Sequence, residues 1–460
     1  MSKPRAQFAT RIGVIAASVG SAIGLGNIWR FPYEAGQHGG GAFLLIYILF
    51  VFAIGVPIIC SEFLIGRSSH SNVLGAFQKL EQKGSKWHLI SYVGILSSLM
   101  ILSFYSVVAG WTLEYTIQSV AGGLKDSSPD YLANYFQEFT TQSNRSLMWT
   151  IVFLLLNYLI IRKGLKNGIE RMSNIMTPLL FVILLVFCVN SLMMPGAADG
   201  LKFLFVPDFS KITPKVMLGA LGQAFFSLSL GVSTLITYAS YFKKDVPLVR
   251  SASIIAGLDT LFAIVAGLII FPALFTYGIE PTEGPKLVFE VLPYIFSQTP
   301  GGQIWAAAFF FLLFLASITS TISMSEISIS FFCEEWKMTR EKASMLNTVI
   351  AIVFGSLCAL SFGAAADWKI FGMTVFDLFN FTTANLLMPV CGIVFAIFAG
   401  WFMDKKLVRS QLTNDETLKV RTYKSIVFSL RYIAPLAILS IFLYQHILLD
   451  LVFLFFSQNQ

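Results

Sequence analysis

Long apolar stretches, separated by short polar ones, follow one another along the whole of this 460-residue chain. A stretch of roughly 17–25 mostly apolar residues can cross a bilayer as a helix, because a helix satisfies its own backbone groups where no water is present. The pattern therefore predicts an all-α integral membrane protein with about eleven transmembrane helices, at 12–36, 41–66, 88–119, 147–162, 173–192, 214–242, 249–275, 303–332, 344–362, 370–402 and 425–447.

Two of these stretches are interrupted. The first contains GSAIGLGNIWRFP, Gly20 to Pro32, and the middle of the sixth reads SLSLG. Non-helical backbone is tolerated at bilayer depth only where it lines a cavity or is buried in protein. One break alone is equally well explained by a glycine kink for close helix packing. Two breaks, five stretches apart, favour a paired binding site of the kind that secondary transporters carry.

An interval of five spans also predicts an internal repeat. A unit with an odd number of spans is inverted in the membrane when it is repeated. We therefore expect a single transporter domain over 1–460, with one repeat at about 8–192, an inverted copy at about 214–402 and an extra helix at about 425–447.

Composition agrees with a membrane protein and excludes other classes. Only 12% of residues are charged, against about 25% in soluble domains. The five cysteines form no CxxC pair and the four histidines are scattered, so we expect no structural metal cluster. No nucleophile–base pair is evident, so we expect no enzyme, and an intramembrane enzyme is the weakest of the alternatives.

The basic residues predict the orientation. With the N-terminus in the cytoplasm, the inner segments carry 23 Lys and Arg and the outer segments carry 7. Lys and Arg are enriched in cytoplasmic loops, so this bias predicts a cytoplasmic N-terminus and an outer C-terminus. The net charge of +7 resides in these loops and implies no nucleic-acid partner.

Three motifs carry a family resemblance. ATRIGVIAASVGSAIGLGNIWRFPYEAGQHGGGAFLLIY resembles the first segment of the neurotransmitter:sodium symporter family, in its bacterial eleven-helix amino-acid transporter branch. GQAFFSLSLGVSTLITYASY resembles that family's sixth helix, and FFLLFLASITSTIS its eighth. The resemblance runs from about Phe8 to the eleventh span. It implies a five-plus-five inverted repeat and sodium-driven, alternating-access uptake of an amino acid across a bacterial inner membrane, with no implication for oligomeric state.

The resemblance implies two sodium sites. Sodium is a hard cation that prefers oxygen ligands. The first site would use Ala22, Asn27, Ser227 and Asp259, together with the carboxylate of the substrate. The second would use the carbonyls of Gly20, Ile23 and Ala316 with the hydroxyls of Thr319 and Ser320. The alternative for these two hydroxyls is hydrogen bonding to their own helix, which is common in membranes.

Asp259 also bears on chloride. It lies within AGLDTLFAIVAGLIIF, and an ionisable residue inside a span is a functional hypothesis by default. Relatives that need chloride lack an acid here, so Asp259 implies chloride-independent transport. Tyr47 and Gln223 occupy positions of the family's chloride ligands, and Ala263 replaces a serine. The alternative is a structural pairing of Asp259 with a neighbouring helix.

The resemblance also implies the substrate site. The N–H groups of Leu25 and Gly26 and the Tyr105 hydroxyl would bind the substrate carboxylate. Relatives that transport amines carry an aspartate in place of Gly24, so Gly24 implies a substrate with its own carboxylate. Carbonyls for the ammonium group would come from Ala22, Phe226, Ser227 and Ser229, and the side-chain pocket would be Ile101, Tyr105, Phe226, Val232, Ser320, Ser323 and Met324.

That pocket is mostly apolar and uncharged, so it implies a neutral hydrophobic amino acid, aliphatic or aromatic. Apolar pockets discriminate by only about 1–3 kcal/mol per methylene, so a broad range of substrates is expected. Two alternatives remain open: a small zwitterion or osmolyte as substrate, and a sensor that binds an amino acid without transporting it.

Gates are implied on both sides. Outside, Phe226 and Tyr105 would close over the substrate, and Arg30 would pair with an acid on the tenth span. Asn380 stands at the expected position, so Asp377, one turn earlier, is the predicted substitute. Inside, Arg5 would pair with Glu334.

Three further features lie within spans. Gly168 and Pro178 match a spacing at which the fifth span unwinds in relatives, and a helix start with a proline kink is the equal alternative. We expect Glu62 to accept hydrogen bonds from broken-helix backbone. The pattern assigns no role to Glu326.

Overall fold

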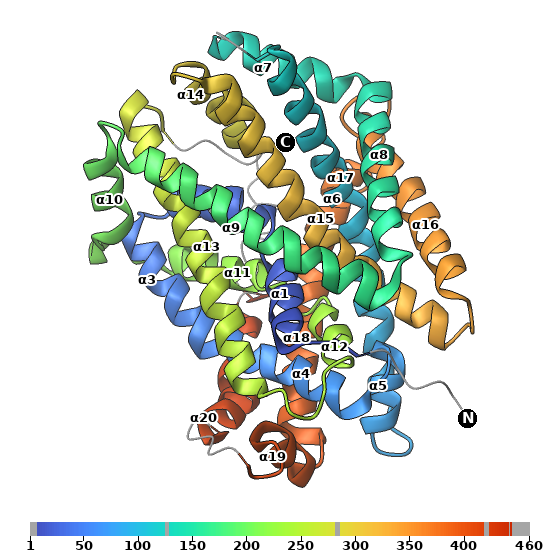
Figure 1. The fold of residues 1–460 in the computed structure, drawn as a ribbon. Helices are drawn as coiled ribbons and strands as arrows, with labels where there is room; N and C mark the ends of the chain where they lie inside the picture. Colours follow the sequence, from blue (N-terminus) through green and yellow to red (C-terminus); the bar gives the residue numbers. More distant parts are fainter. Residues whose placement is uncertain (1–6, 125–127, 281–285, 418–422, 441, 444–460) are drawn as a thin grey trace, which may run out of the picture.

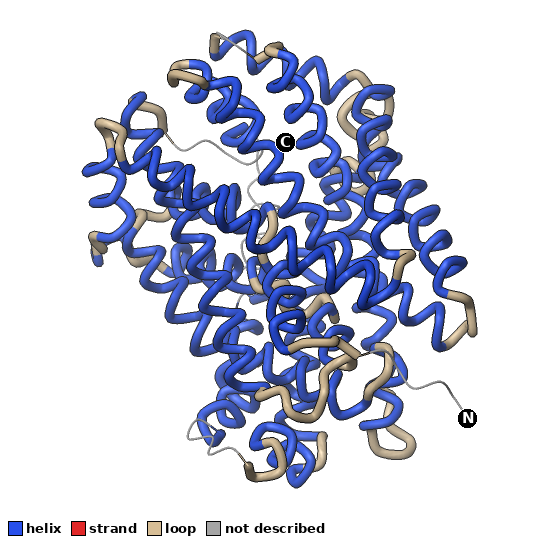
Figure 2. Tube along the Cα trace, in the orientation of Figure 1, coloured by secondary structure: helices blue, strands red, loops and turns tan. Residues whose placement is uncertain are grey.

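Helices make up the regular secondary structure of this protein, in a computed structural model that describes residues 7–124, 128–280, 286–417, 423–440 and 442–443 (Figure 2). Across these residues the extended structure is limited to an isolated bridge between Ile370 and Met373. The predicted all-α class is therefore confirmed.

Eight continuous helical segments of the described residues are long and apolar enough to cross a membrane. Five of them are each built on one α-helix: α6 (Ile90–Ala121), α8 (Ser143–Ile161), α13 (Leu248–Tyr277), α15 (Gly302–Glu334) and α16 (Arg340–Leu360). The other three join α-helices to short π-helical (η) stretches: α3 (Gly41–Phe50), η2 (Val51–Gly55) and α4 (Val56–Ser69); η4 (Leu165–Glu170) and α9 (Arg171–Leu192); and α17 (Val375–Thr382), η7 (Thr383–Leu387), α18 (Met388–Ile397) and η8 (Phe398–Phe402).

The first span is broken as predicted. Helix α1 (Arg11–Ala22) ends where Ile23 adopts an extended conformation, with φ −70° and ψ 114°. The chain becomes helical again through η1 (Gly26–Arg30) and α2 (Phe31–Gln37). The helix axis bends by 54° between the two halves. Counted as one span, this bent pair raises the number of crossings among the described residues to nine.

The sixth span is broken more widely. Helix α11 (Pro214–Ser227) and helix α12 (Thr234–Ala239) are separated by six residues without regular helix. Ser229, Gly231 and Ser233 in this linker have positive φ values of 52°, 78° and 72°. A Cβ atom on Gly231 would lie 2.1 Å from the Met388 carbonyl oxygen, so the linker can pass this close to α18 only with glycine there.

The eleventh predicted span begins as α20 (Tyr423–Phe428) and η9 (Ser429–Ile433), and its last part, 444–447, lies outside the described residues. Shorter helices outside the spans are α5 (Val73–Leu80), α7 (Pro129–Thr141), α10 (Ala197–Phe205), α14 (Leu292–Ser297) and α19 (Lys405–Thr413).

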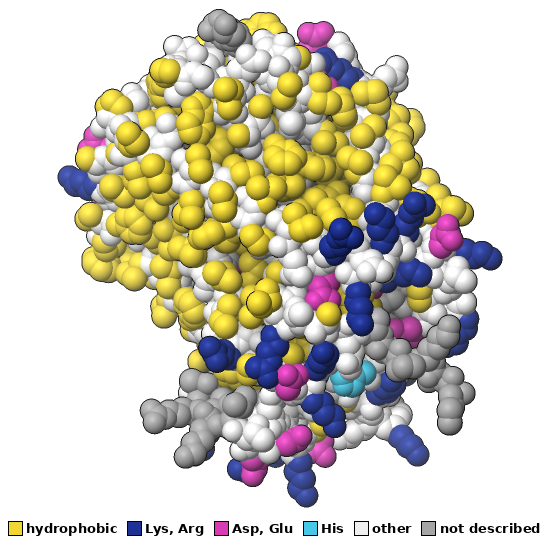
Figure 3. Space-filling model, viewed as in Figure 1, with side chains coloured by type: hydrophobic (Ala, Val, Ile, Leu, Met, Phe, Trp, Pro, Cys, Tyr) yellow, Lys and Arg dark blue, Asp and Glu magenta, His cyan; other side chains and the backbone are white. Residues whose placement is uncertain are grey.

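The two ends of the molecule differ in charge. Apolar side chains cover most of the face in Figure 3, while Lys and Arg gather at its lower end. In Figure 1 that end carries α5 and α19, and α7 and α14 lie at the opposite end. An apolar belt with one basic end is typical of a protein that crosses a membrane.

The interrupted helices lie inside the bundle. Helix α15 packs along α6, and α1 contacts α9, α13 and α15 (Figure 1). The end of α1 is buried, as is the linker between α11 and α12. The fold thus places both breaks in its core, where backbone groups freed from helical bonding face other protein groups rather than lipid.

Candidate functional site

The first predicted sodium site is a closed cluster of oxygen-bearing side chains from three elements. The Asn27 amide nitrogen donates to Asp259 Oδ1 at 2.8 Å and lies 3.0 Å from Ser227 Oγ. The Ser227 hydroxyl donates to Asp259 Oδ2 at 2.6 Å. All three side chains are buried, and Ala22, the fourth predicted ligand, is the last residue of α1. The carboxylate and hydroxyl oxygens fit sodium's preference for hard donors, while the Asn27 amide oxygen, predicted as a ligand, accepts a hydrogen bond from Gly24 N–H at 3.1 Å.

Residues at the predicted chloride positions adjoin this cluster. The Tyr47 hydroxyl lies 3.3 Å from both Asp259 Oδ2 and Ser227 Oγ. Gln223 donates to the Gly26 carbonyl at 3.0 Å, and its side-chain oxygen is buried without a hydrogen bond. Ala263 is buried and offers no donor. The Asp259 carboxylate is thus the negatively charged group beside these positions, in hydrogen-bond contact with Tyr47.

The second predicted sodium site gathers where α1 ends beside α15. The Ser320 hydroxyl lies 3.2 Å from both the Ile23 and the Ala316 carbonyl oxygens. The Thr319 hydroxyl is 3.0 Å from the Ala316 carbonyl, and a Cβ atom on Gly20 would be 3.5 Å from Thr319 Cβ. The five predicted residues therefore converge. Both hydroxyls bond to carbonyls of their own helix, and Ser320 also reaches α1.

The predicted carboxylate site surrounds the break in the first span. Leu25 N–H donates to the Tyr105 hydroxyl at 3.0 Å. A Cβ atom on Gly24 would lie 2.7 Å from that hydroxyl oxygen and 2.9 Å from Ser320 Oγ. A Cβ atom on Gly26 would lie 2.8 Å from the Phe226 ring. The two glycines thus keep the backbone close to groups from α6, α11 and α15.

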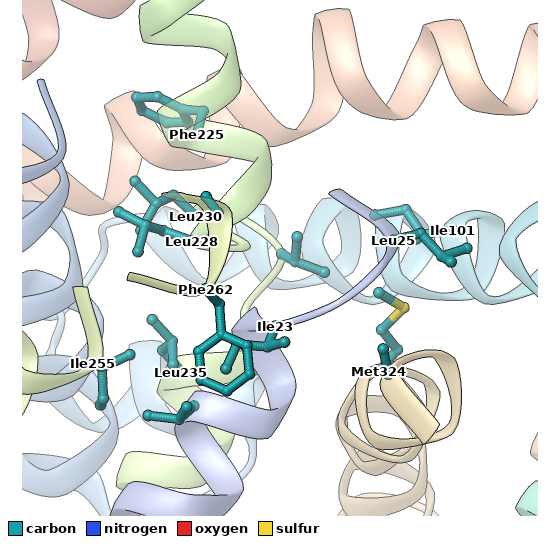
Figure 4. Packing of buried hydrophobic residues seen from close by; sticks show 14 of the residues in the cluster. Ile23, Leu25, Ile101, Phe225, Leu228, Leu230, Leu235, Ile255, Phe262 and Met324 are labelled. Carbon is teal, nitrogen blue, oxygen red and sulfur yellow. The ribbon is translucent and has the colours of Figure 1, made fainter. Parts of the chain in front are cut away.

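The apolar residues Ile101, Val232 and Met324 of the predicted pocket come from two helices, α6 and α15, and from the linker of the sixth span. Figure 4 shows the side chains of Leu25 and Ile101 side by side, with Met324 reaching toward them from α15. Ile101, Val232 and Met324 are each at most 8% exposed. Ser323 is turned toward α1, where its hydroxyl receives a hydrogen bond from Ser21 at 2.8 Å. Ser229 lies in the linker of the sixth span.

A cavity of about 400 Å³ opens above this pocket. Tyr105, Phe226 and Arg30 line it, and the Arg30 guanidinium lies 4.4 Å from the centroid of the Phe226 ring. Asp377 and Asn380 of α17 line the cavity as well. The structure thus brings together the predicted residues of the outer gate.

The Arg30 ion pair recorded among the described residues is with Glu34, on the same helix, at 3.5 Å. The Asp377 carboxylate instead accepts a hydrogen bond from the Thr374 hydroxyl at 2.7 Å. Pairing of Arg30 with Asp377 therefore stays a prediction, for a closed gate. Sequence reasoning missed Glu34, although its i,i+4 spacing from Arg30 is a readable signal.

On the inner side, Glu334 accepts hydrogen bonds from the Asn72 backbone N–H at 2.8 Å and from its side-chain amide at 3.0 Å. Arg5, its predicted partner, lies outside the described residues. Glu62 accepts a hydrogen bond from Gly231 N–H, in the broken sixth span, at 2.9 Å. The predicted role of Glu62 is therefore confirmed.

Glu326, to which the sequence assigned no role, is the centre of a buried network. It accepts hydrogen bonds from the Tyr241 hydroxyl at 2.6 Å and from Arg340 at 2.6 and 2.8 Å. Arg340 also donates to the Ile161 carbonyl at 2.9 Å. The network ties α15 to α8 and α16 at their inner ends. The sequence signal that could have predicted this pair is an acid within one span followed by an arginine at the start of the next span.

Two broken helices that meet inside a helical bundle, beside a cluster of buried polar side chains, are typical of secondary transporters. A model of the Sodium:neurotransmitter symporter family matches residues 5–135 and 130–452. The chain belongs to this family and is a sodium-dependent symporter, not an enzyme.

Relatives support this assignment over the whole chain. The sodium-dependent transporter YhdH of Bacillus subtilis is 38% identical over 437 residues, covering 95% of this chain and 97% of its own. A sodium-dependent transporter of Haemophilus influenzae is 36% identical, with 96% and 98% coverage. The structure of MhsT in complex with L-phenylalanine is similar with a TM-score of 0.88 at 42% identity, covering 96% of this chain and 99% of that one. The likeness confirms the predicted transporter fold.

Proposed function

We propose that this symporter imports a neutral hydrophobic amino acid, aliphatic or aromatic, together with sodium held at two sites and without a requirement for chloride. Gly24 is the observation that carries the proposal. Gly24 brings no side-chain charge beside the Tyr105 hydroxyl, and its N–H donates to Asn27 Oδ1 at 3.1 Å, next to the Asn27–Asp259 cluster where a substrate carboxylate would complete the first ion site.

The chemistry of the pocket supports an apolar side chain. Ile101, Val232 and Met324 are apolar and buried, and the other predicted pocket residues, Tyr105, Phe226, Ser320 and Ser323, include no carboxylate or basic side chain. The similar transporter MhsT was solved with L-phenylalanine, which agrees with a large hydrophobic substrate.

The charge balance supports chloride independence. Asp259 supplies one fixed negative charge among Tyr47, Asn27 and Ser227, at the place where an anion would otherwise be needed. Without it, one sodium ion and a zwitterionic substrate would leave an uncompensated positive charge in a low-dielectric cavity.

Orientation follows the basic end of the molecule. We infer that the end carrying α5 and α19 faces the cytoplasm of a bacterial cell. The predicted outer position of the C-terminus falls on residues outside the described part of the chain.

Reconstitution into liposomes tests the proposal. Uptake into liposomes should be compared with and without a sodium gradient, which separates transport from binding alone. All twenty amino acids should be offered as competitors. Uptake that follows the sodium gradient and is blocked best by hydrophobic amino acids is expected. Sodium-dependent binding without uptake would identify a sensor, and preferential competition by glycine or an osmolyte would overturn the substrate class.

A further inference from the structure

A carboxylate from the fifth span holds the inner end of α1. Ala9 N–H donates to Glu170 Oε2 at 2.9 Å, and Thr10 N–H donates to Oε1 at 3.2 Å. The Thr10 hydroxyl donates to the same Oε1 at 3.2 Å. N–H groups at a helix start lack partners within the helix, and the helix dipole favours an anion there. Glu170 therefore caps α1 from a different span.

The contact depends on one position in α1. A Cβ atom on Gly13 would lie 2.1 Å from Glu170 Oε1, so the carboxylate can approach only while residue 13 is glycine. Gly13 N–H donates to the Thr10 hydroxyl at 2.9 Å, which orients that hydroxyl toward Glu170. Glu170 itself is 4% exposed. Glu170 is therefore buried in close contact with α1, at a position that only glycine in α1 allows.

Glu170 sits on the least regular part of the fifth span. It is the last residue of η4, a π-helical stretch that follows Gly164 with φ 83°. Pro178 lies inside α9, where it offers no N–H to the turn before it. Short π-helical stretches are rare and occur often at functional sites. A local loss of helix here would withdraw the carboxylate from α1.

The same helix reaches the second predicted sodium site. Two turns beyond Glu170, the Thr177 hydroxyl donates to the Ala16 carbonyl at 3.3 Å. A Cβ atom on Gly20 would lie 2.8 Å from the Thr177 hydroxyl oxygen. Helix α9 thus follows α1 from its first turn to a residue assigned to the ion.

We propose that Glu170 is a positioning residue whose three hydrogen bonds to Ala9 and Thr10, here called the clasp, hold the inner half of α1 against α9. These hydrogen bonds must break before α1 can move away and open the second sodium site toward the cytoplasm. The inference rests on the proposed function. Sodium bound between α1 and α15 keeps α1 in place, so sodium and the closed clasp strengthen each other.

Hydrogen–deuterium exchange on the full chain in lipid nanodiscs tests this coupling. Glu170→Ala removes the acceptor of all three hydrogen bonds. Gly13→Ala displaces the carboxylate while raising the intrinsic helix propensity of α1, so its effect cannot come from a weaker helix. Asp245→Asn is the matched control, because it breaks an exposed ion pair with Arg11 at the same end of α1, 2.8 Å long.

In saturating sodium, amides of residues 11–20 should exchange at least tenfold faster in Glu170→Ala and Gly13→Ala than in the unmodified chain. The sodium concentration for half-maximal protection should also rise, and Asp245→Asn should behave as the unmodified chain. Glu170→Gln keeps a neutral acceptor, so its exchange rate should lie between those of the unmodified chain and Glu170→Ala. It replaces Glu170→Ala in the comparison if the alanine variant does not fold.

Exchange in Glu170→Gln and Gly13→Ala at the rate of the unmodified chain would overturn the clasp. Failure of sodium to slow exchange in the unmodified chain would instead overturn the proposed function, because that comparison does not involve Glu170.

Discussion

Arg30 and Glu34, one helical turn apart on the outer half of the first span, form an ion pair of 3.5 Å above the predicted substrate site. Arg30 also lies over the Phe226 ring, and both residues line the cavity of about 400 Å³. Glu34 is further engaged by His38, whose Nδ1 is 3.3 Å from Glu34 Oε2. Arg30 is thus paired within its own helix, while the cavity lies between it and its predicted partner on α17, Asp377.

This pairing predicts opposite effects for two acids. Glu34→Gln frees Arg30 for α17 and should slow dissociation of a bound amino acid to the outside. Asp377→Asn removes the predicted partner in the closed gate and should speed it. Partly exposed ion pairs contribute about 1 kcal/mol, so we expect changes of about fivefold. Labelled-substrate dissociation measures both. Unchanged rates in both variants would mean that the gate closes without an ion pair.

Asp259 predicts chloride-independent uptake. Replacing external chloride by gluconate at constant sodium should leave transport by the unmodified protein intact, because the fixed carboxylate already balances the charge. Asp259→Asn should abolish uptake or make it depend on chloride. Asp199→Asn, in α10 outside the spans, is a control of the same chemical change. A large fall in uptake by the unmodified protein in gluconate would contradict the fixed-charge interpretation.

Thr319 and Ser320 should contribute to sodium affinity. Thr319→Val with Ser320→Ala removes two oxygens at little change in volume, and each hydrogen bond or contact to a charged group contributes about 1.5–3 kcal/mol. We expect sodium to bind at least tenfold more weakly in an equilibrium titration. Thr321→Val is the matched control, because this hydroxyl bonds only to the Ser317 and Ile318 carbonyls of its own helix. Normal sodium affinity in the double variant would favour simple back-bonding.

The inner network predicts a strong stability effect. Glu326 is fully buried and pairs at 2.6 Å with Arg340, which is partly exposed, so removing Arg340 leaves a buried carboxylate uncompensated. Such a loss costs about 3–5 kcal/mol. Glu326→Gln and Arg340→Met should each lower thermal stability markedly, and the double variant should lose less than the sum. Additive losses in this cycle would show that the two side chains do not act as a pair.

Gly24 predicts the charge that the substrate carries. A hydrophobic amino acid should bind more tightly as sodium rises, because its carboxylate and the ion neutralise each other in a low-dielectric cavity. The corresponding decarboxylated amine should bind poorly at every sodium concentration. Comparable binding of the amine would refute the shared carboxylate site.

Gly24→Asp and Gly24→Ala separate charge from size at this position. Both add a Cβ atom that meets Tyr105 and Ser320, but only the aspartate repels the substrate carboxylate. The aspartate variant should therefore bind the amino acid more weakly than the alanine variant does, by at least tenfold.

The sequence by itself determined the class, the spans and the two breaks, because the bilayer imposes a length and a polarity on every crossing segment, and glycine-rich runs stand out against them. Asn27 and Asp259 could be singled out for the same reason: a polar side chain within an apolar span needs a partner or a ligand.

Only the tertiary structure decided which partner each polar group has. Arg30 was expected to reach across to α17 and is paired with Glu34, and Glu326 had no assigned role until Arg340 and Tyr241 were placed beside it. Glu170 and Gly13 are separated by 157 residues of sequence, yet they fit within one hydrogen-bond network. Hydrophobic periodicity specifies that a helix is buried, but the distances between atoms on different helices depend on how the helices pack.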